Sequence, residues 1–258
     1  MYFCLISAIM VERGEIMKKQ GISQEALKLA ACLTMLIDHI GATLVLQQWY
    51  SSWDPSVLNL YYVLRVIGRI AFPIYCFLLV EGAHYTRDPK KYGIRLAIGM
   101  VLSELPFDLA FNEGLDWASN SVMVTLLLGF LMIEAMKRVK GFWKVVLILP
   151  FFLAAEWMGT DYGGNGILII AMLALTKGVK HEKLWRTVGF VCLLSFGAEI
   201  QIGSLWVPIE LFGLLSLPLI FCYSGKKLTR NKAVQWAFYL FYPVHLTILW
   251  ILETVIYG

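Results

Sequence analysis

Long apolar stretches recur along the whole chain and are separated by short polar segments. A helix needs about 20 apolar residues to cross the hydrocarbon of a bilayer, and nine stretches come close to that length. The second one contains Pro73 and is long enough to bend, so we expect a bend near this proline. The pattern predicts an all-α, polytopic membrane bundle of about nine helices, at roughly 26–47, 57–84, 92–111, 120–137, 142–158, 162–178, 184–200, 204–223 and 233–256.

Positive charge falls in alternate loops, which orients the predicted bundle. Lysines and arginines precede the first stretch and lie in the loops after the second, fourth, sixth and eighth, whereas the other loops carry acids and aromatic residues. Cytoplasmic loops of membrane proteins carry the excess of Lys and Arg. We therefore expect a cytoplasmic N-terminus, an external C-terminus and a multi-pass protein of the bacterial cytoplasmic (inner) membrane.

Composition agrees with this class. The chain has 258 residues, of which 59% are hydrophobic and 16% charged, more apolar than a typical soluble domain. The net charge of +4 is explained by loop topology, so we expect no nucleic acid partner.

We expect one membrane domain over residues 17–258. Residues 1–16 begin with an apolar run that is too short to span a bilayer and lacks the basic start of a signal peptide. We interpret them as a flexible or non-native extension, with Met17 as the natural start.

Ionisable residues in the middle of apolar helices mark candidate sites, because they are costly in hydrocarbon. Asp38 and His39 lie in the run LTMLIDHIGAT of the first stretch. Arg65 and Arg69 lie four apart in the second stretch, on one helix face, and His245 lies at similar depth in the ninth, after Tyr239 and Tyr242. Neighbouring helical residues point about 100° apart, so Asp38 and His39 cannot pair with each other. We expect one to face Arg69 and the other to face the ninth helix or a substrate.

A purely structural interpretation stays open for these residues. Asp38 and one acid from the outer half of the bundle could neutralise both arginines in a buried network that only fixes packing. The candidate acids are Glu104, Asp108, Glu156, Glu199 and Glu210.

Other chemistry is not indicated. The five cysteines are scattered one to a segment, without the spacing of a disulfide framework or a metal site. We therefore expect no metal.

Four ordered segments resemble the TraX family of conjugal-transfer, F-pilin-acetylation membrane proteins, which is similar to polytopic membrane acyltransferases. They are LTMLIDHIGA at 33–42, RVIGRIAFPIYCFLLVEGAHYTRDPKKYGIRL at 65–96, DYGGNGILII at 161–170 and FYLFYPVHL at 238–246. The resemblance implies transfer of an acetyl group from cytoplasmic acetyl-CoA to an amine or hydroxyl of an envelope acceptor, a pilin-like peptide or a glycan. It implies His39 as the catalytic base, Arg65 and Arg69 as the pair that handles the donor, and His245 with Tyr242 as the closing wall.

Two alternatives remain open at this point. A proton-coupled transporter could use the same His/Asp/Arg cluster as a relay, although no internal repeat of the kind found in many transporters is visible. A non-catalytic scaffold for pilus or envelope assembly would need the charges only for packing.

Overall fold

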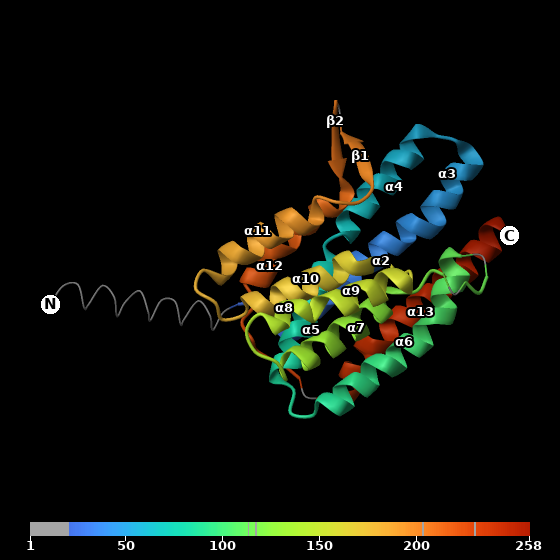
Figure 1. The fold of residues 1–258 in the computed structure, drawn as a ribbon. Helices are drawn as coiled ribbons and strands as arrows, with labels where there is room; N and C mark the ends of the chain where they lie inside the picture. Colours follow the sequence, from blue (N-terminus) through green and yellow to red (C-terminus); the bar gives the residue numbers. More distant parts are fainter. Residues whose placement is uncertain (1–20, 113, 117, 203, 230) are drawn as a thin grey trace.

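The computed structural model describes residues 21–258, except 113, 117, 203 and 230. It is mostly helical, with one two-stranded β-sheet (Figure 1). The extension predicted at 1–16 and the start at Met17 lie outside the described residues.

The first predicted stretch is one continuous helical rod of three segments. Helix α2 (Gln24–Ile40) runs into a π-helical turn, η1 (Gly41–Val45), and then into α3 (Leu46–Ser52). Ser23 caps the start of α2, since its hydroxyl accepts a hydrogen bond from the Ala26 backbone N–H at 3.2 Å. A π-helical turn is rare and is often found at functional sites. Here it follows directly after Asp38 and His39.

The second predicted stretch is interrupted one turn before the proline near which a bend was expected. Helix α4 (Pro55–Gly68) ends at Arg69–Ile70, and α5 (Ala71–Tyr85) begins there. Pro73 has no N–H to donate to the carbonyl of Arg69, four residues earlier, so the helical ladder is interrupted at that carbonyl. The break places Arg69 at the end of α4, next to α2.

The middle and last stretches form helices close to the predicted bounds. They are α6 (Pro89–Phe111), α7 (Val122–Met136), α8 (Trp143–Val146), α9 (Ile148–Trp157), α10 (Gly163–Thr176) and α13 (Lys232–Tyr257). Helix α13 packs against α6 and α2, which brings the first and last parts of the chain together (Figure 1).

The predictions for 184–200 and 204–223 are wrong in part, because a short β-hairpin interrupts the otherwise mostly helical fold. Helix α11 (Glu182–Leu194) ends early, and strands β1 (Glu199–Ile202) and β2 (Leu205–Pro208) form an antiparallel hairpin that projects from the helical body (Figure 1). A 3₁₀ helix, η2 (Ile209–Ser216), and α12 (Leu217–Phe221) follow. Residues 199–202 alternate polar residues with isoleucine, and Trp206 and Val207 are strand-favouring types, a pattern that favours strands. The expected spans rested on apolar content alone.

Three of the described helices are long and apolar enough to cross a membrane: Gln24–Ser52, Pro55–Tyr85 and Ala233–Tyr257. Shorter apolar helices lie at Val122–Met136, Gly163–Thr176 and Ile209–Phe221. A helical membrane bundle therefore agrees with the structure at this coarser level.

The core is centred on α5, which is buried along most of its length. Glycines let its neighbours approach closely, as small residues do between packed membrane helices. A Cβ on Gly129 of α7 would lie 2.3 Å from Ile170 of α10, and one on Gly41 would lie 2.9 Å from Leu64 of α4. The second contact brings η1, which continues α2, against α4 next to the level where Asp38 and Arg65 lie.

Candidate functional site

Asp38 joins both arginines of the second stretch in one buried network. Its Oδ2 accepts a hydrogen bond from Arg65 Nη1 at 2.6 Å, and its Oδ1 accepts one from Arg69 Nη2 at 2.8 Å. Asp38 and Arg69 are both buried, whereas the Arg65 side chain keeps 24% of its surface exposed. The prediction that one member of the Asp38–His39 pair faces Arg69 is confirmed, and that member is Asp38.

A second carboxylate completes the neutralisation of Arg69. Arg69 Nη1 donates to Glu210 Oε1 at 2.7 Å and to the Tyr162 hydroxyl at 3.4 Å. Glu210 is held at the start of η2, directly after the β-hairpin, and the Tyr162 ring stacks on Phe72 with centroids 3.5 Å apart. Glu210 is thus the outer-half acid that the structural interpretation required.

Gly68 is what allows the Asp38 carboxylate to lie against the backbone of α4. A Cβ built on Gly68 would lie 2.0 Å from Asp38 Oδ1 and 2.2 Å from its Cβ. Both contacts are far shorter than van der Waals separation, so a side chain here would displace the carboxylate.

His39 faces the last helix, as the second half of the prediction requires. Its Nδ1 lies 2.7 Å from Nε2 of His245 on α13, and the two rings are nearly parallel with centroids 4.9 Å apart. His245 Nδ1 lies 2.6 Å from the backbone carbonyl oxygen of Phe241. Both histidines are buried.

This chain of contacts determines where the protons lie on two neutral imidazoles. A carbonyl oxygen can only accept, so His245 Nδ1 carries the hydrogen and His245 Nε2 carries a lone pair. His39 Nδ1–H then donates to that lone pair, which leaves Nε2 of His39 unprotonated. Within the described residues this nitrogen has no hydrogen-bond partner, and His39 lines a cavity. The geometry therefore presents His39 Nε2 as a free base.

Aromatic rings enclose the histidine pair. Phe111 from α6 meets the His39 ring edge-on at 5.3 Å, and Tyr242 from α13 meets it edge-on at 5.9 Å and the His245 ring at 5.7 Å. Tyr242 and His245, both on α13, thus lie together beside the His39 ring.

A cavity of about 230 Å³, which we call the small cavity, contains the charged cluster. Asp38, His39, Arg65 and Arg69 line it. The C-terminal end of α6 and the two residues before α10, Asp161 and Tyr162, also contribute to its wall. The four mid-helix residues that the sequence singled out in the first two stretches are thus at one site.

Asp161 also lines the small cavity, although the sequence predicted it only as a loop residue. Its carboxylate forms no hydrogen bond or ion pair with the described residues, although Arg65 and Arg69 are near enough to influence its titration. It is accessible from the cavity, but the protein atoms packed around it desolvate the charged form. That desolvation outweighs the arginines and raises the pKa of Asp161 to about 6.

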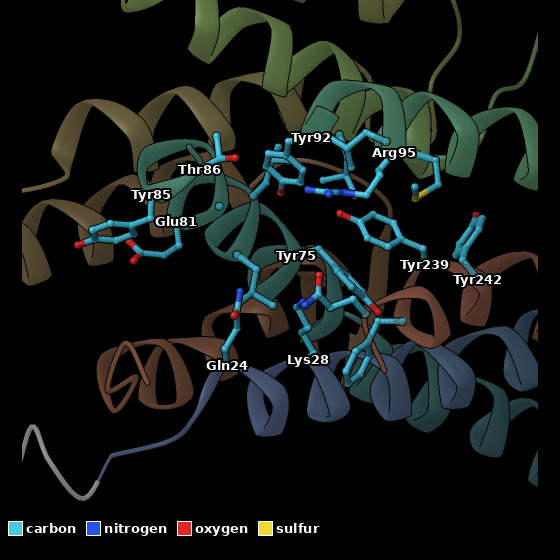
Figure 2. Close-up of a pocket in the computed structure, with 18 of the residues that line it drawn as sticks. Gln24, Lys28, Tyr75, Glu81, Tyr85, Thr86, Tyr92, Arg95, Tyr239 and Tyr242 are labelled. Atoms are coloured by element: carbon cyan, nitrogen blue, oxygen red, sulfur yellow. The ribbon is translucent and has the colours of Figure 1, made fainter. Parts of the chain in front are cut away.

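A second and larger cavity of about 450 Å³ opens toward the ends of α2, α5 and α6 (Figure 2). We call it the large cavity. Met35, Tyr75 and Val122 line both cavities, so these side chains lie between them, and we call this group the neck. Tyr242 lines the large cavity on the other side of the His39 ring. The histidine pair therefore lies between the two cavities, with His39 lining the small one and Tyr242 lining the large one.

The remaining outer-half acids have local structural partners. Glu104 accepts a hydrogen bond from the Ser121 hydroxyl at 2.6 Å, Asp108 from Asn112 at 3.1 Å, and Glu156 from the Gly164 backbone N–H at 2.7 Å. Glu199 lies on the hairpin. Sequence reasoning missed Tyr75, Asp161 and Tyr162. The last two open the DYGGNG segment, whose acid and glycines were the available signal.

Comparisons with known proteins agree on one family. Residues 23–253 match the sequence profile of the family described as TraX protein. The chain is 33% identical over 240 residues to the probable fimbrial assembly protein FimC, serogroup H1, of Dichelobacter nodosus, covering 86% of this chain and 92% of the relative. It is 24% identical over 235 residues to Protein TraX of Escherichia coli, covering 89% of this chain and 86% of the relative. No solved structure matches.

Proposed function

Because this chain belongs to the TraX family, we propose that it is an integral membrane acetyltransferase. It moves an acetyl group from acetyl-CoA to an amine or hydroxyl of an envelope acceptor, a pilin-like peptide or a glycan. The observation that carries this proposal is the free Nε2 of His39, fixed by His245 at the neck between two cavities.

The proposal includes a topology of about nine membrane segments in the bacterial inner membrane, with the N-terminus inside. The large cavity then opens to the cytoplasm, since Lys28, Thr86 and Lys227 at its mouth belong to the basic side of the chain. The small cavity opens to the exterior, at the side of Asn112, Ser119 and Asp161. Donor and acceptor therefore reach the histidine pair from opposite faces.

His39 Nε2 acts as the general base in the proposed reaction. It takes the proton of the acceptor N–H or O–H while the acceptor nitrogen or oxygen forms a bond to the thioester carbonyl carbon. When the C–S bond breaks, His39 returns the proton to the leaving sulfur. The acceptor has gained the acetyl group, the coenzyme leaves as its thiol, and the imidazole is again neutral.

Arg65 is placed to stabilise the negative charge that develops on the carbonyl oxygen. It uses Nη1 for Asp38, whereas its Nε and Nη2 form no hydrogen bond with the described residues, and its side chain is partly open to the small cavity. Preorganised donors of this kind contribute most where water is excluded. Arg69, by contrast, is engaged with Asp38, Glu210 and Tyr162 and holds the network in place.

The names of these relatives are compatible with an acceptor in a pilus or fimbria, because they describe fimbrial assembly and TraX proteins. They fit a second candidate equally well, a non-catalytic assembly factor. The observation that favours this candidate is the closed ion network, in which Asp38 and Glu210 satisfy Arg69 without a ligand. Such a network can serve packing alone.

Acetyl transfer by the purified full-length protein separates the two candidates. The protein is reconstituted in liposomes with labelled acetyl-CoA on the basic side and envelope extract on the other, and labelled products are resolved by mass. We expect wild-type protein to label an envelope component and His39→Gln to label none. Equal labelling by wild type and His39→Gln, or none by either with correctly folded protein, would favour the assembly factor.

A further inference from the structure

Three cations converge on the large cavity. Lys28 comes from α2, Arg95 from α6 and Lys227 from the segment after α12. Figure 2 shows Lys28 and Arg95 directed into the same space, with Arg95 between Tyr92 and Tyr239. Lys28 lies within electrostatic range of both Lys227 and Arg95. Like charges held this close repel one another, and an anion would relieve the repulsion.

These three cations form no salt bridge with a carboxylate of the described residues. The carboxylates nearby have other partners: Glu81 pairs with Lys177, and Glu25 accepts hydrogen bonds from the backbone N–H groups of Leu228 and Thr229. Nε of Arg95 is buried without a hydrogen-bond partner. The large cavity thus holds three cations without a salt-bridged carboxylate among the described residues, and one guanidinium donor, Arg95 Nε, without a partner.

The large cavity, with a volume of about 450 Å³, also has room for more than an ion. Besides the cations, Gln24, Glu81, Thr86 and Gln235 line it. The rest of the wall is mostly aromatic and apolar and includes Tyr75 and Tyr242, of which Tyr242 lies against the His39 ring. A ligand that fits would carry phosphate at one end and a slender, less polar arm at the other.

We propose that Lys28, Arg95 and Lys227 form a phosphate-binding subsite that anchors the charged end of the acyl donor. This rests on the proposed function and assigns the donor's phosphates to residues other than Arg65 and Arg69. Those two arginines are engaged by Asp38 and Glu210 in the small cavity, on the far side of the neck. Phosphate can come from two sources, a soluble nucleotide thioester or an anionic phospholipid.

Binding by the full-length protein in nanodiscs of neutral lipid tests the subsite without activity. The probes are coenzyme A, dephospho-coenzyme A and pantetheine, measured by titration calorimetry. The variants are Arg95→Gln, Arg95→Lys and the exposed Lys227→Ala. Lys90→Ala is the matched control, because Lys90 is an exposed cation at the same end of the molecule that does not line the cavity.

We expect Arg95→Gln and Lys227→Ala each to weaken coenzyme A binding by about tenfold, the value of one lost charged hydrogen bond. Arg95→Lys should recover part of the loss, and Lys90→Ala should match wild type. Pantetheine, which lacks the nucleotide, should bind all variants alike. Equal coenzyme A affinity in wild type and every variant would overturn the subsite while leaving the acetyltransferase proposal intact.

Anionic phospholipid is tested in a second arm. In one outcome, coenzyme A does not bind, whereas phosphatidylglycerol copurifies with wild type and is lost in Arg95→Gln. In that case the three cations bind phosphate, but the ligand is a phospholipid and not a soluble nucleotide thioester. If wild type binds neither, the subsite is refuted. If coenzyme A binds through the three cations and no acetyl transfer occurs, the proposed function fails and the subsite stands.

Discussion

Nδ1 of His39 and Nε2 of His245 lie 2.7 Å apart, although 206 residues separate them in sequence. Because the Phe241 carbonyl fixes the proton on the far side of His245, the contact gives the two histidines unequal roles. His39 keeps a free nitrogen toward the small cavity, and His245 orients it.

Replacing each histidine should therefore have a different effect on acetyl transfer. We expect His39→Gln to lower the rate by about 10² to 10⁴, the usual contribution of a general base. His245→Gln should lower it by about 10 to 100, as loss of an orienting partner does. His84→Gln, on a histidine that lines neither cavity, is the control. A His39 variant that retains full activity while the His245 variant has none would reverse the assignment.

Asp38 should matter more for stability than any surface carboxylate. Asp38→Asn leaves two guanidinium groups without their shared counter-charge, and breaking a buried pair costs about 3–5 kcal/mol. The free energy of unfolding in detergent measures this loss. The matched control is Glu134→Gln, which breaks the more exposed pair with Lys137 and should cost at most about 1 kcal/mol. Equal losses in the two variants would contradict a buried network around Asp38.

Gly68→Ala tests whether the network depends on close approach of α2 and α4. The added Cβ would fall 2.0 Å from Asp38 Oδ1, so the carboxylate must move away from Arg65 and Arg69. We expect a loss of thermal stability and of acetyl transfer together. Gly99→Ala is the control, since its Cβ would meet the flexible end of Met123 at 2.9 Å, which can shift. A Gly68 variant as stable and active as this control would refute the prediction.

Asp161 should make stability depend on pH in a direction opposite to that of most carboxylates. Its pKa is raised to about 6, so the folded state holds the proton more tightly than the unfolded state. The stabilisation from the protonated form is complete below the ordinary value of 3.8 and is lost as pH rises through about 6. Asp161→Asn should therefore gain stability relative to wild type between pH 4 and 6, with a constant difference above that range. Thermal unfolding at stepped pH measures it.

Asp88 supplies a control of opposite sign. This exposed residue caps α6, and the Lys91 backbone N–H lowers its pKa. Asp88→Asn should therefore lose stability relative to wild type as pH rises through the range where Asp88 ionises. A difference between Asp161→Asn and wild type that is the same at every pH would show that the Asp161 carboxyl titrates normally.

Part of the site could be predicted from sequence because helical geometry is local. The spacing of Arg65 and Arg69 puts both on one face, and the adjacency of Asp38 and His39 sends them to different partners; the structure confirms both. The identity of Glu210 among five candidate acids could not be chosen, because it depends on how the hairpin places η2. The hairpin itself was not predicted, because the apolar content of residues 184–223 was interpreted as two helices.

The two cavities could not be predicted from the sequence either. Each is lined by residues from helices far apart in the chain, such as Lys28 with Arg95 and Lys227. The hydrophobic pattern of a helix indicates at what depth in the membrane a residue lies. It does not indicate which neighbouring helices leave a cavity beside that residue. The loop residue Asp161 became part of the site only through the packing of α10 beside α5.

The neck of Met35, Tyr75 and Val122 has a consequence for the cell as well as for the reaction. In the proposed orientation, these side chains separate a cavity that opens to the cytoplasm from one that opens to the exterior. The neck must let a short acyl chain reach His39 and still keep protons and salt from flowing down their gradients. A methionine, a tyrosine and a valine suit this task, because flexible and bulky side chains can close around a slender group and leave no continuous file of water.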